Sequence, residues 1–387
     1  MTDQFQKILL AVTMLIIPFA GRASDHGDPL QADTVPQRKN IIDRLLDYFA
    51  ESNKPDYSKG LDVSFIGGPH YASDTKLGIG LVTAGNYLAD RSDTSAIPSN
   101  VSLYSDISTA GFALLGLRGT HIFPSDRRRI DYNIFFYSFP TEFWGLDFGS
   151  QRNDDGKSSY RLLSYRASAT FMWRLGDNLF AGPALEFHHY DARKAQRPEL
   201  WLGQDMVTNT VGAGFRLQYD SRDSHTGPAT GWLFVLDQKF CPRFLSNSYA
   251  FSFTALRLAR YTPLWRGGVL AAQVAGRFAY GNVCWSMMSN LDEGGGMRSY
   301  YEGRYRNKCA LNVVAELRQH VWRRSGVTFW AGAGVVTPAI ESVRWSRVLP
   351  CVGLGYRWEF KKRCNVRLDY GIGRGSSSFS FNINEAF

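Results

Sequence analysis

The chain has 387 residues, of which 44% are hydrophobic and 14% aromatic, so it is long enough for one large domain or two or three small ones. A mean hydropathy of -0.24 excludes a bundle of membrane-spanning helices, which would need several apolar runs of about 18 residues or more. The net charge is +9, but the basic residues are spread along the chain and alternate with apolar ones, so we expect no nucleic-acid partner.

The N-terminal end has the pattern of a signal peptide. Lys7 precedes an apolar run over residues 8–20, and Gly21 and Ala23 supply small residues for cleavage. The apolar run is too short to span a membrane as a helix. We therefore predict a signal peptide over 1–23 and an exported mature protein.

Residues 24–60 are polar and contain several prolines, and we predict a periplasmic linker with one helix at about 35–51. Thr34 and Gln37 can form a capping box at its start. One face of the helix carries apolar residues at helical spacing, namely Ile41, Ile42, Leu45, Leu46 and Phe49. An amphipathic helix of this length is marginal alone in water, so it should dock on another surface.

From residue 61 to the end, the hydrophobic period changes from about 3.6 to about 2, which is typical of strands. Turn residues such as Ser73-Asp74 and Gly176-Asp177-Asn178 separate the segments. We predict sixteen strands, at about 61–67, 76–86, 100–108, 111–122, 128–139, 159–174, 178–190, 206–219, 230–240, 248–260, 267–280, 309–320, 326–336, 347–360, 363–373 and 376–387.

Each predicted strand has one apolar face and one face rich in Arg, Gln, Thr or Gly. In 206–219, for example, Val211 and Phe215 oppose Thr210. A soluble sandwich would show the same alternation. A membrane barrel is favoured because the strands are about 10 to 15 residues long, because aromatic residues gather near strand ends, and because an even number of strands can close without an edge. We predict an all-β fold: a 16-stranded antiparallel transmembrane β-barrel over 61–387, in the outer membrane of a Gram-negative bacterium.

The sequence contains no pattern typical of catalysis or metal binding. The five cysteines lack the paired spacing of a metal site. Asp220, Ser221 and His225 are close in sequence, but they fit a polar turn better than a catalytic triad. We expect no metal, no cofactor and no enzymatic activity.

The longest gap between predicted strands in the C-terminal half is a loop at about 281–308. Its three consecutive glycines, Gly294 to Gly296, precede a dense set of Arg and Tyr. A long loop in a compact architecture is usually functional or disordered, and aromatic and arginine side chains need partners. We predict that this loop folds into the lumen, with a motif formed by Gly296, Arg298, Ser299 and Tyr300.

The last strands offer charged partners for this loop on their inward-facing positions. Alternation places six charged residues on the lumenal wall: Glu316, Arg318, Arg357, Glu359, Arg367 and Asp369. The guanidinium of Arg298 can form a charge-assisted pair with a wall carboxylate, and both Glu316 and Asp369 are suitable. An ordinary charged channel wall is the alternative interpretation.

These motifs together resemble the BamA/TamA family of outer-membrane barrels, also called bacterial surface antigen barrels. The family's sixth extracellular loop carries an Arg-Gly-Tyr motif that enters the lumen. The corresponding residues here are Arg298-Ser299-Tyr300 in the loop, Glu316-Leu317-Arg318, Gly353-Leu354-Gly355-Tyr356-Arg357 and Arg367-Leu368-Asp369-Tyr370-Gly371 on the strands, and a terminal Phe387 similar to the C-terminal signal of such barrels.

Two positions depart from the family pattern. Ser299 stands where the loop motif has Gly, and the segment 328–334 lacks the Asp that usually pairs with the loop Arg. Too few residues precede the barrel for the family's periplasmic POTRA domains, so the chain resembles the POTRA-less members.

The resemblance implies insertion or export of outer-membrane or surface molecules through a lateral seam between the first and last strands, near 61–67 and 376–387. Glycines at 371, 373 and 375 would weaken strand pairing beside it. The alternatives are a passive pore and an accessory subunit of a larger outer-membrane complex. We expect a monomeric barrel whose partners are outer-membrane lipid and other outer-membrane proteins or a periplasmic protein.

Overall fold

The computed structural model describes residues 61–72, 76–89, 98–361, 364–383 and 385–387. The predicted signal peptide and the predicted helix at 35–51 lie outside the described residues. Within the described residues, no helix is long and apolar enough to cross a membrane.

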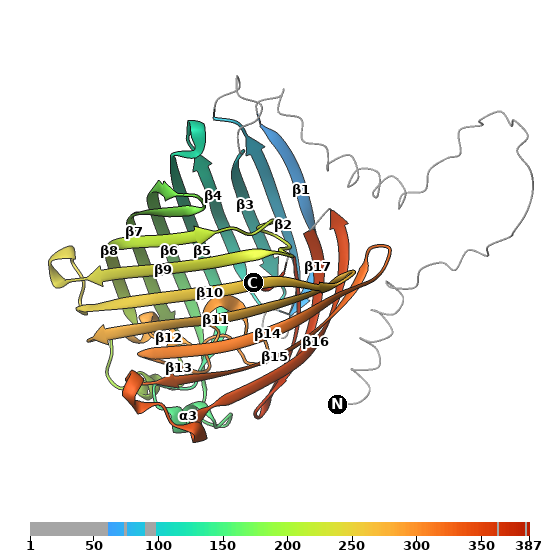
Figure 1. The fold of residues 1–387 in the computed structure, drawn as a ribbon. Helices are drawn as coiled ribbons and strands as arrows, with labels where there is room; N and C mark the ends of the chain where they lie inside the picture. Colours follow the sequence, from blue (N-terminus) through green and yellow to red (C-terminus); the bar gives the residue numbers. More distant parts are fainter. Residues whose placement is uncertain (1–60, 73–75, 90–97, 362–363, 384) are drawn as a thin grey trace, which may run out of the picture. The chain divides into compact units, whose positions relative to one another are not determined.

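Sixteen strands form one antiparallel sheet, and each predicted strand is present in the predicted order (Figure 1). The strands are β1 (Asp62–Ala72), β2 (Lys76–Tyr87), β3 (Ser99–Ser108), β4 (Ala113–Ile122), β5 (Arg128–Phe143), β6 (Ser158–Gly176), β7 (Leu179–Arg193), β8 (Val207–Asp220), β9 (Gly231–Cys241), β10 (Phe251–Trp265), β11 (Gly268–Gly281), β14 (Cys309–Trp322), β15 (Ser325–Thr337), β16 (Leu349–Lys361), β17 (Cys364–Gly373) and β18 (Ser376–Ile383). The fold prediction is therefore confirmed. A second, two-stranded sheet of β12 (Ser289–Asn290) and β13 (Arg306–Asn307) lies in the long loop.

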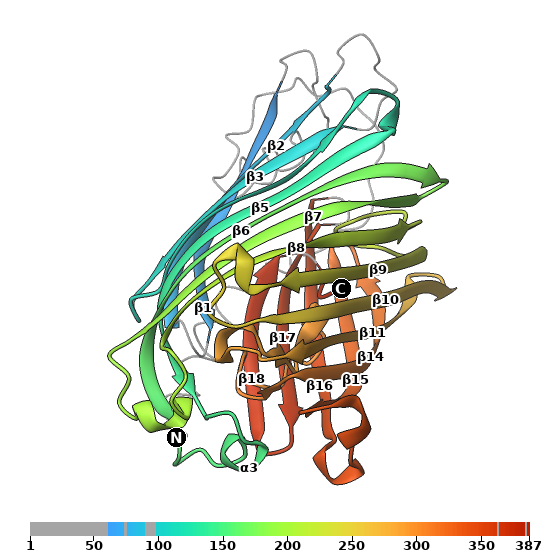
Figure 2. The same ribbon diagram turned by 90° about the vertical axis from the view of Figure 1, so that its left-hand side faces the viewer.

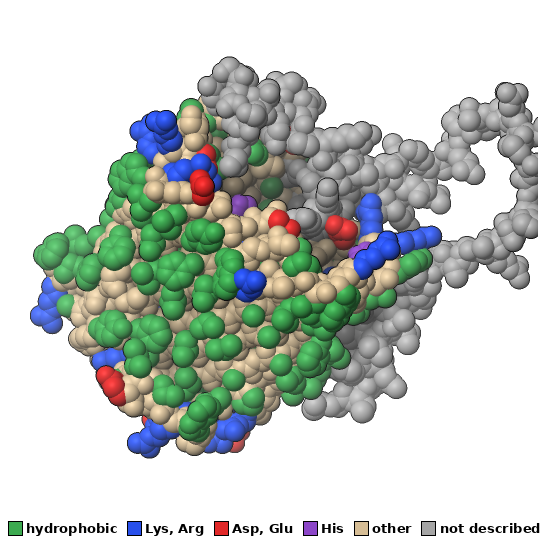
Figure 3. Space-filling model, in the orientation of Figure 1, with side chains coloured by type: hydrophobic (Ala, Val, Ile, Leu, Met, Phe, Trp, Pro, Cys, Tyr) green, Lys and Arg blue, Asp and Glu red, His purple; other side chains and the backbone are tan. Residues whose placement is uncertain are grey.

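The two faces of the sheet differ in the way that alternation predicts. On β14, Leu311 and Val313 are 36% and 51% exposed, whereas Asn312, Val314 and Glu316 are at most 1% exposed. Hydrophobic side chains are spread over the outer face that Figure 3 shows, and few charged side chains lie among them. A sheet with an apolar outer face and charged residues inside matches a barrel whose solvent is hydrocarbon.

The connections differ in length at the two ends of the sheet. At one end most turns are short, as between β10 and β11, where Gly267 has a φ of +76° that favours glycine; the β8–β9 connection at 221–230 is longer. At the other end lie the long loops 144–157, 194–206 and 282–308. Short turns on one side and long loops on the other are typical of outer-membrane barrels.

The two ends of the sheet meet. Figures 1 and 2 show the sheet curving round from β1 to β18, and Cα atoms of these two strands approach within 8 Å. The sequence predicted a last strand that reaches Phe387, and this boundary is wrong. β18 ends at Ile383, and Phe387 is 5% exposed in a buried cluster with residues of the long loop.

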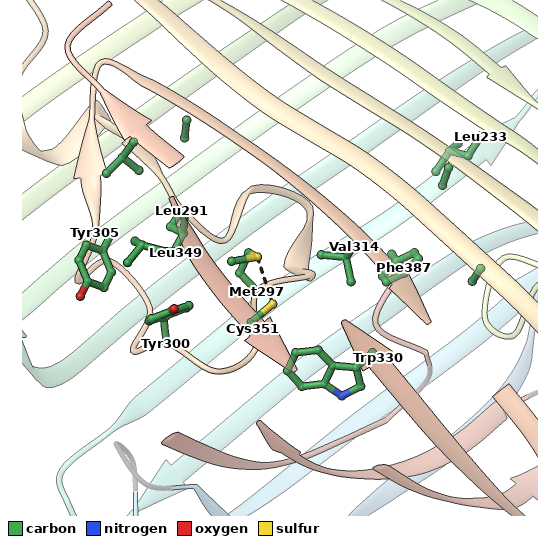
Figure 4. Packing of buried hydrophobic residues seen from close by; sticks show 14 of the residues in the cluster. Leu233, Leu291, Met297, Tyr300, Tyr305, Val314, Trp330, Leu349, Cys351 and Phe387 are labelled. Carbon is green, nitrogen blue, oxygen red and sulfur yellow. Dashed lines mark hydrogen bonds between the residues drawn. The ribbon is translucent and has the colours of Figure 1, made fainter. Parts of the chain in front are cut away.

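Aromatic residues fill the interior at the long-loop end. Phe143 and Tyr160 from β5 and β6 pack against Trp201 and Trp285, which belong to two loops. The ring centroids of Phe143 and Trp201 are 4.2 Å apart, and those of Trp201 and Trp285 are 5.7 Å apart. The second buried cluster surrounds the loop 282–308 and includes Met297, Trp330 and Phe387 (Figure 4).

Candidate functional site

The loop 282–308 folds into the interior and is held there by wall residues. The side-chain amide of Asn312 donates to the carbonyl oxygens of Leu291 and Glu293, at 2.9 and 2.7 Å. Gln273 donates to the carbonyl oxygen of Gly294 at 3.1 Å. A Cβ added to Gly296 would lie 2.7 Å from Val314, so only glycine allows this approach to the wall.

Arg298 lies at the centre of the site and contacts both carboxylates that the sequence left as alternatives. Its Nη1 is 3.0 Å from Oδ2 of Asp369, and its Nη2 forms an ion pair with Oε2 of Glu316. Its guanidinium also stacks on the ring of Trp330, at 4.4 Å from the centroid. The Arg298 side chain is only 6% exposed, so these contacts replace its hydration.

Wall arginines complete the pairing of the two carboxylates. Arg318 Nε is 2.7 Å from Oε1 of Glu316, and Arg357 Nη1 is 2.7 Å from Oδ1 of Asp369. Arg367 Nε is 3.3 Å from Oδ2 of Asp369. We call the following residues the arginine network: Arg298, Glu316, Arg318, Arg357, Arg367, Asp369 and Glu385. Its four arginines face three carboxylates, so the charges nearly balance, as burial requires.

Two glycines of β16 make room for the network. A Cβ on Gly353 would lie 2.2 Å from the ring of Trp330, and one on Gly355 would lie 2.3 Å from Oδ1 of Asp369. The Gly-x-Gly-x-Arg motif is thereby explained, because its glycines leave space for the stacked ring and the carboxylate, and its Arg357 pairs with that carboxylate.

Ser299 and Glu359 differ from what the sequence suggested for them. The φ of Ser299 is not positive, so the loop turn here does not require the glycine of the related motif. Glu359 lies near the end of β16, where its backbone amide donates to the carbonyl of Arg324 at 2.7 Å, and we assign it no part in the network.

Sequence reasoning missed Glu385, which lies beyond β18 and joins the network from the chain's last residues. Its carboxylate is 2.9 Å from Nε of Arg357 and 3.7 Å from Nε of Arg318, and it accepts a hydrogen bond from Asn365 at 2.7 Å. Burial alone would raise the pKa of Glu385, but Arg318 and Arg357 hold the pKa below its ordinary value.

Asp292 in the long loop has a raised pKa, whereas the pKa of Glu385 is lowered. The Oδ1 atom of Asp292 accepts a hydrogen bond from the backbone amide of Met297 at 2.6 Å, and the residue is half-buried. Desolvation, with the charge of Glu302 as the next cause, raises the pKa of Asp292 to about 7. Asp292 is therefore largely protonated below neutral pH, unlike Glu385.

Tyr300 ties the loop to the strands beside the seam. Its hydroxyl donates to the carbonyl oxygen of Pro350 at 2.6 Å and accepts from the amide of Arg374 at 2.8 Å. The neighbouring carbonyl of Ser299 accepts from the hydroxyl of Ser376 at 2.9 Å. These bonds link the loop to β16, to the β17–β18 turn and to β18.

Replacing Tyr300 with phenylalanine is expected to lower the free energy of unfolding by about 1–2 kcal/mol, because its two part-buried hydrogen bonds to the backbone of Pro350 and Arg374 are lost. The measurement is urea titration of the folded barrel in detergent. Tyr165→Phe is the matched control, because Tyr165 is 44% exposed on the outer face, and it should shift the midpoint little. Equal losses in the two variants would show that the bridge has no stabilising role.

Comparison with known proteins agrees with this architecture. BamA from Haemophilus ducreyi lacking POTRA domains 1-3 superposes with a TM-score of 0.55 at 13% identity, over 84% of this chain and 69% of that one. CdiB from Acinetobacter baumannii and CdiB from Escherichia coli both give 0.53, at 11% and 10% identity over 85% of this chain, which spans 60% and 63% of theirs. No curated protein matches the chain.

The family model agrees with the structural neighbours and with the motifs in the last strands. The Omp85 superfamily domain matches residues 120–387, which include the long loop and every member of the arginine network. The predicted resemblance and the predicted location in the outer membrane of a Gram-negative bacterium are confirmed. The chain belongs to the Omp85 superfamily, whose members are outer-membrane insertion and secretion barrels.

Proposed function

We propose that the protein inserts or exports outer-membrane or surface molecules through a lateral seam between β1 and β18. The observation that carries this proposal is the arrangement of the terminal strands. Their Cα atoms approach within 8 Å, but the hydrogen-bonded strand order in the described part of the chain begins at β1 and ends at β18. An edge with unpaired backbone groups can pair with an added strand.

The residues beside the seam favour a weakly held edge. β18 has 8 residues and is the shortest strand of the large sheet, so its ladder to β17 has few hydrogen bonds. Gly371 and Gly373 lie on the adjoining strand β17, and glycine inside a strand weakens pairing. Separation near β18 would therefore cost less than separation between the longer strands.

The filled interior supports this function over that of a passive pore. Met297, Ser299 and Tyr300 of the loop are at most 6% exposed inside the barrel, and the aromatic cluster around Trp285 packs the long-loop end. A channel that conducts continuously would need an open path through these residues. We propose outer-membrane lipid as the surroundings, and other outer-membrane proteins or a periplasmic protein as partners of a monomeric barrel.

A disulfide across the seam tests the proposal. Cysteines are placed in pairs along β1 (Val63 or Phe65) and β18 (Phe379 or Phe381), and insertion of a reporter barrel into vesicles is measured before and after reduction. We expect oxidation to abolish most of the activity and reduction to restore it, because the edge cannot open while the strands are joined.

The matched control is a Leu368→Cys, Phe381→Cys pair, which joins residues that already face each other in the β17–β18 ladder. This disulfide should leave insertion unchanged. Full activity with the seam disulfide formed would contradict the proposal, and an accessory role would then be the better explanation. High ion conductance through the disulfide-bonded barrel would instead favour a pore.

A further inference from the structure

We propose that the inner wall carries a binding site for the chain's own residues 385–387, and that occupation of this site holds the end of β18 away from the seam. This inference rests on the proposed function for its consequence, but the site itself is argued from contacts. The segment carries a carboxylate side chain at Glu385, followed two residues later by the aromatic ring of Phe387.

Contacts from β14, from β16 and from the β8–β9 connection at 221–230 hold the segment. Besides the ion pairs of Glu385 with Arg357 and Arg318, its backbone amide donates to the carbonyl of Thr226 at 3.2 Å. Arg318 Nη2 donates to the main-chain oxygen of Phe387 at 2.9 Å, and its Nη1 donates to the carbonyl of Pro228 at 3.2 Å. The Glu385 carboxylate, the Glu385 amide and the Phe387 oxygen therefore each have a partner, as in a peptide-binding site.

The ring of Phe387 also has partners in the interior. It is 5% exposed in the buried cluster with Val314 and Trp330, and the Arg318 guanidinium lies 5.6 Å from its centroid. Figure 4 shows it beside Val314. The carbonyl of Ala386 would lie 3.3 Å from a Cβ on Gly295, so the segment also reaches the base of the long loop.

The alternation of side chains along β18 explains why the segment leaves the wall. Phe379 and Phe381 pair with Tyr370 and Leu368 on the outer face, and continued alternation would put Glu385 on that face too. A carboxylate facing hydrocarbon is costly, whereas the interior site pairs it with two arginines. Arg318 and Arg357 also bind Glu316 and Asp369, the wall carboxylates that pair with Arg298 of the long loop. The end of the seam strand and the loop therefore share one network.

The test is photocrosslinking of the full-length protein in its native membrane, with benzoyl-phenylalanine in place of Phe387. Mass spectrometry of the crosslinked peptides should place most crosslinks on β14 or the turn at 226–228. Glu385→Gln should lower this interior fraction at least threefold and raise crosslinks to β1 or lipid. Glu199→Gln, at a 62% exposed side chain of a loop, is the control and should leave the pattern unchanged.

Crosslinks that lie mainly on β1 or lipid in the unmodified background would overturn the site, and an unchanged pattern in Glu385→Gln would overturn its ionic basis. Retention of the heat-modifiable folded form on a gel shows that each variant is still a barrel. The readout needs no insertion activity, so failure of the seam proposal and failure of this site are distinguishable. An interior crosslink pattern with no effect of the seam disulfide would leave the site standing and remove its proposed consequence.

Discussion

Replacing Arg298 with methionine is expected to lower the free energy of unfolding by about 3 kcal/mol or more. The side chains of Glu316 and Asp369, which it contacts, are 0% and 1% exposed. Methionine keeps much of the side-chain volume but removes the charge, and water cannot take its place. Arg318 and Arg357 still pair with the two carboxylates, which keeps the expected loss near the lower end of the range for a broken buried ion pair.

Urea titration of the barrel in detergent measures this loss. Arg197→Met is the matched control, because Arg197 and Glu199 form an ion pair whose side chains are 44% and 62% exposed. That pair should contribute at most about 1 kcal/mol. If Arg298→Met were no more destabilising than Arg197→Met, the arginine network would not hold the loop in solution.

The strands of the barrel wall were predictable because each of them separates hydrocarbon from a polar interior. Hydrocarbon outside and charged groups inside impose a period of about 2, and β14 carries it without a break from Leu311 to Arg318. Five of the buried wall residues also follow from strand phase alone, namely Glu316, Arg318, Arg357, Arg367 and Asp369. Strand ends were less predictable, because the last strand stops when its side chains no longer suit the outer face.

The choice between Glu316 and Asp369 could not be made from sequence. The two carboxylates lie on β14 and β17, with two strands between them, so their separation depends on the curvature of the wall. Arg298 contacts Glu316 with Nη2 and Asp369 with Nη1. This is possible only if the loop places the guanidinium between the two strands on the inner side of the wall. Neither curvature nor the path of a glycine-rich loop is encoded in local spacing.

Trp330 and Glu385 show the two ways in which a site residue escaped prediction. Trp330 stands in the segment where the related barrels carry a carboxylate, and its part became visible only as a ring stacked on Arg298 over the space left by Gly353. Glu385 did carry a signal, because a charged residue in the lipid-facing phase of a last strand indicates that the chain leaves the wall before it.

Replacing Glu316 with glutamine is expected to destabilise the protein more than Arg298→Met does. Glu316 pairs with Arg298 and Arg318, and Nη2 of Arg357 lies 3.7 Å from it. Glutamine has nearly the same shape but no charge, so four buried arginines would then face only two carboxylates. We expect a loss of about 4 kcal/mol, measured by urea titration beside the exposed control Glu199→Gln.

The double variant Arg298→Met, Glu316→Gln measures how much of the stability depends on the ion pair between these two residues. It removes one cation and one anion, so the remaining three arginines face two carboxylates, and the imbalance is smaller than in Glu316→Gln alone. Its loss should be less than the sum of the two single losses by about 1–3 kcal/mol, the coupling energy typical of residues within one ionic network. Additive losses would mean that Arg298 and Glu316 stabilise the barrel independently, and the loop would then be held by its backbone bonds to Asn312 and Gln273 rather than by charge.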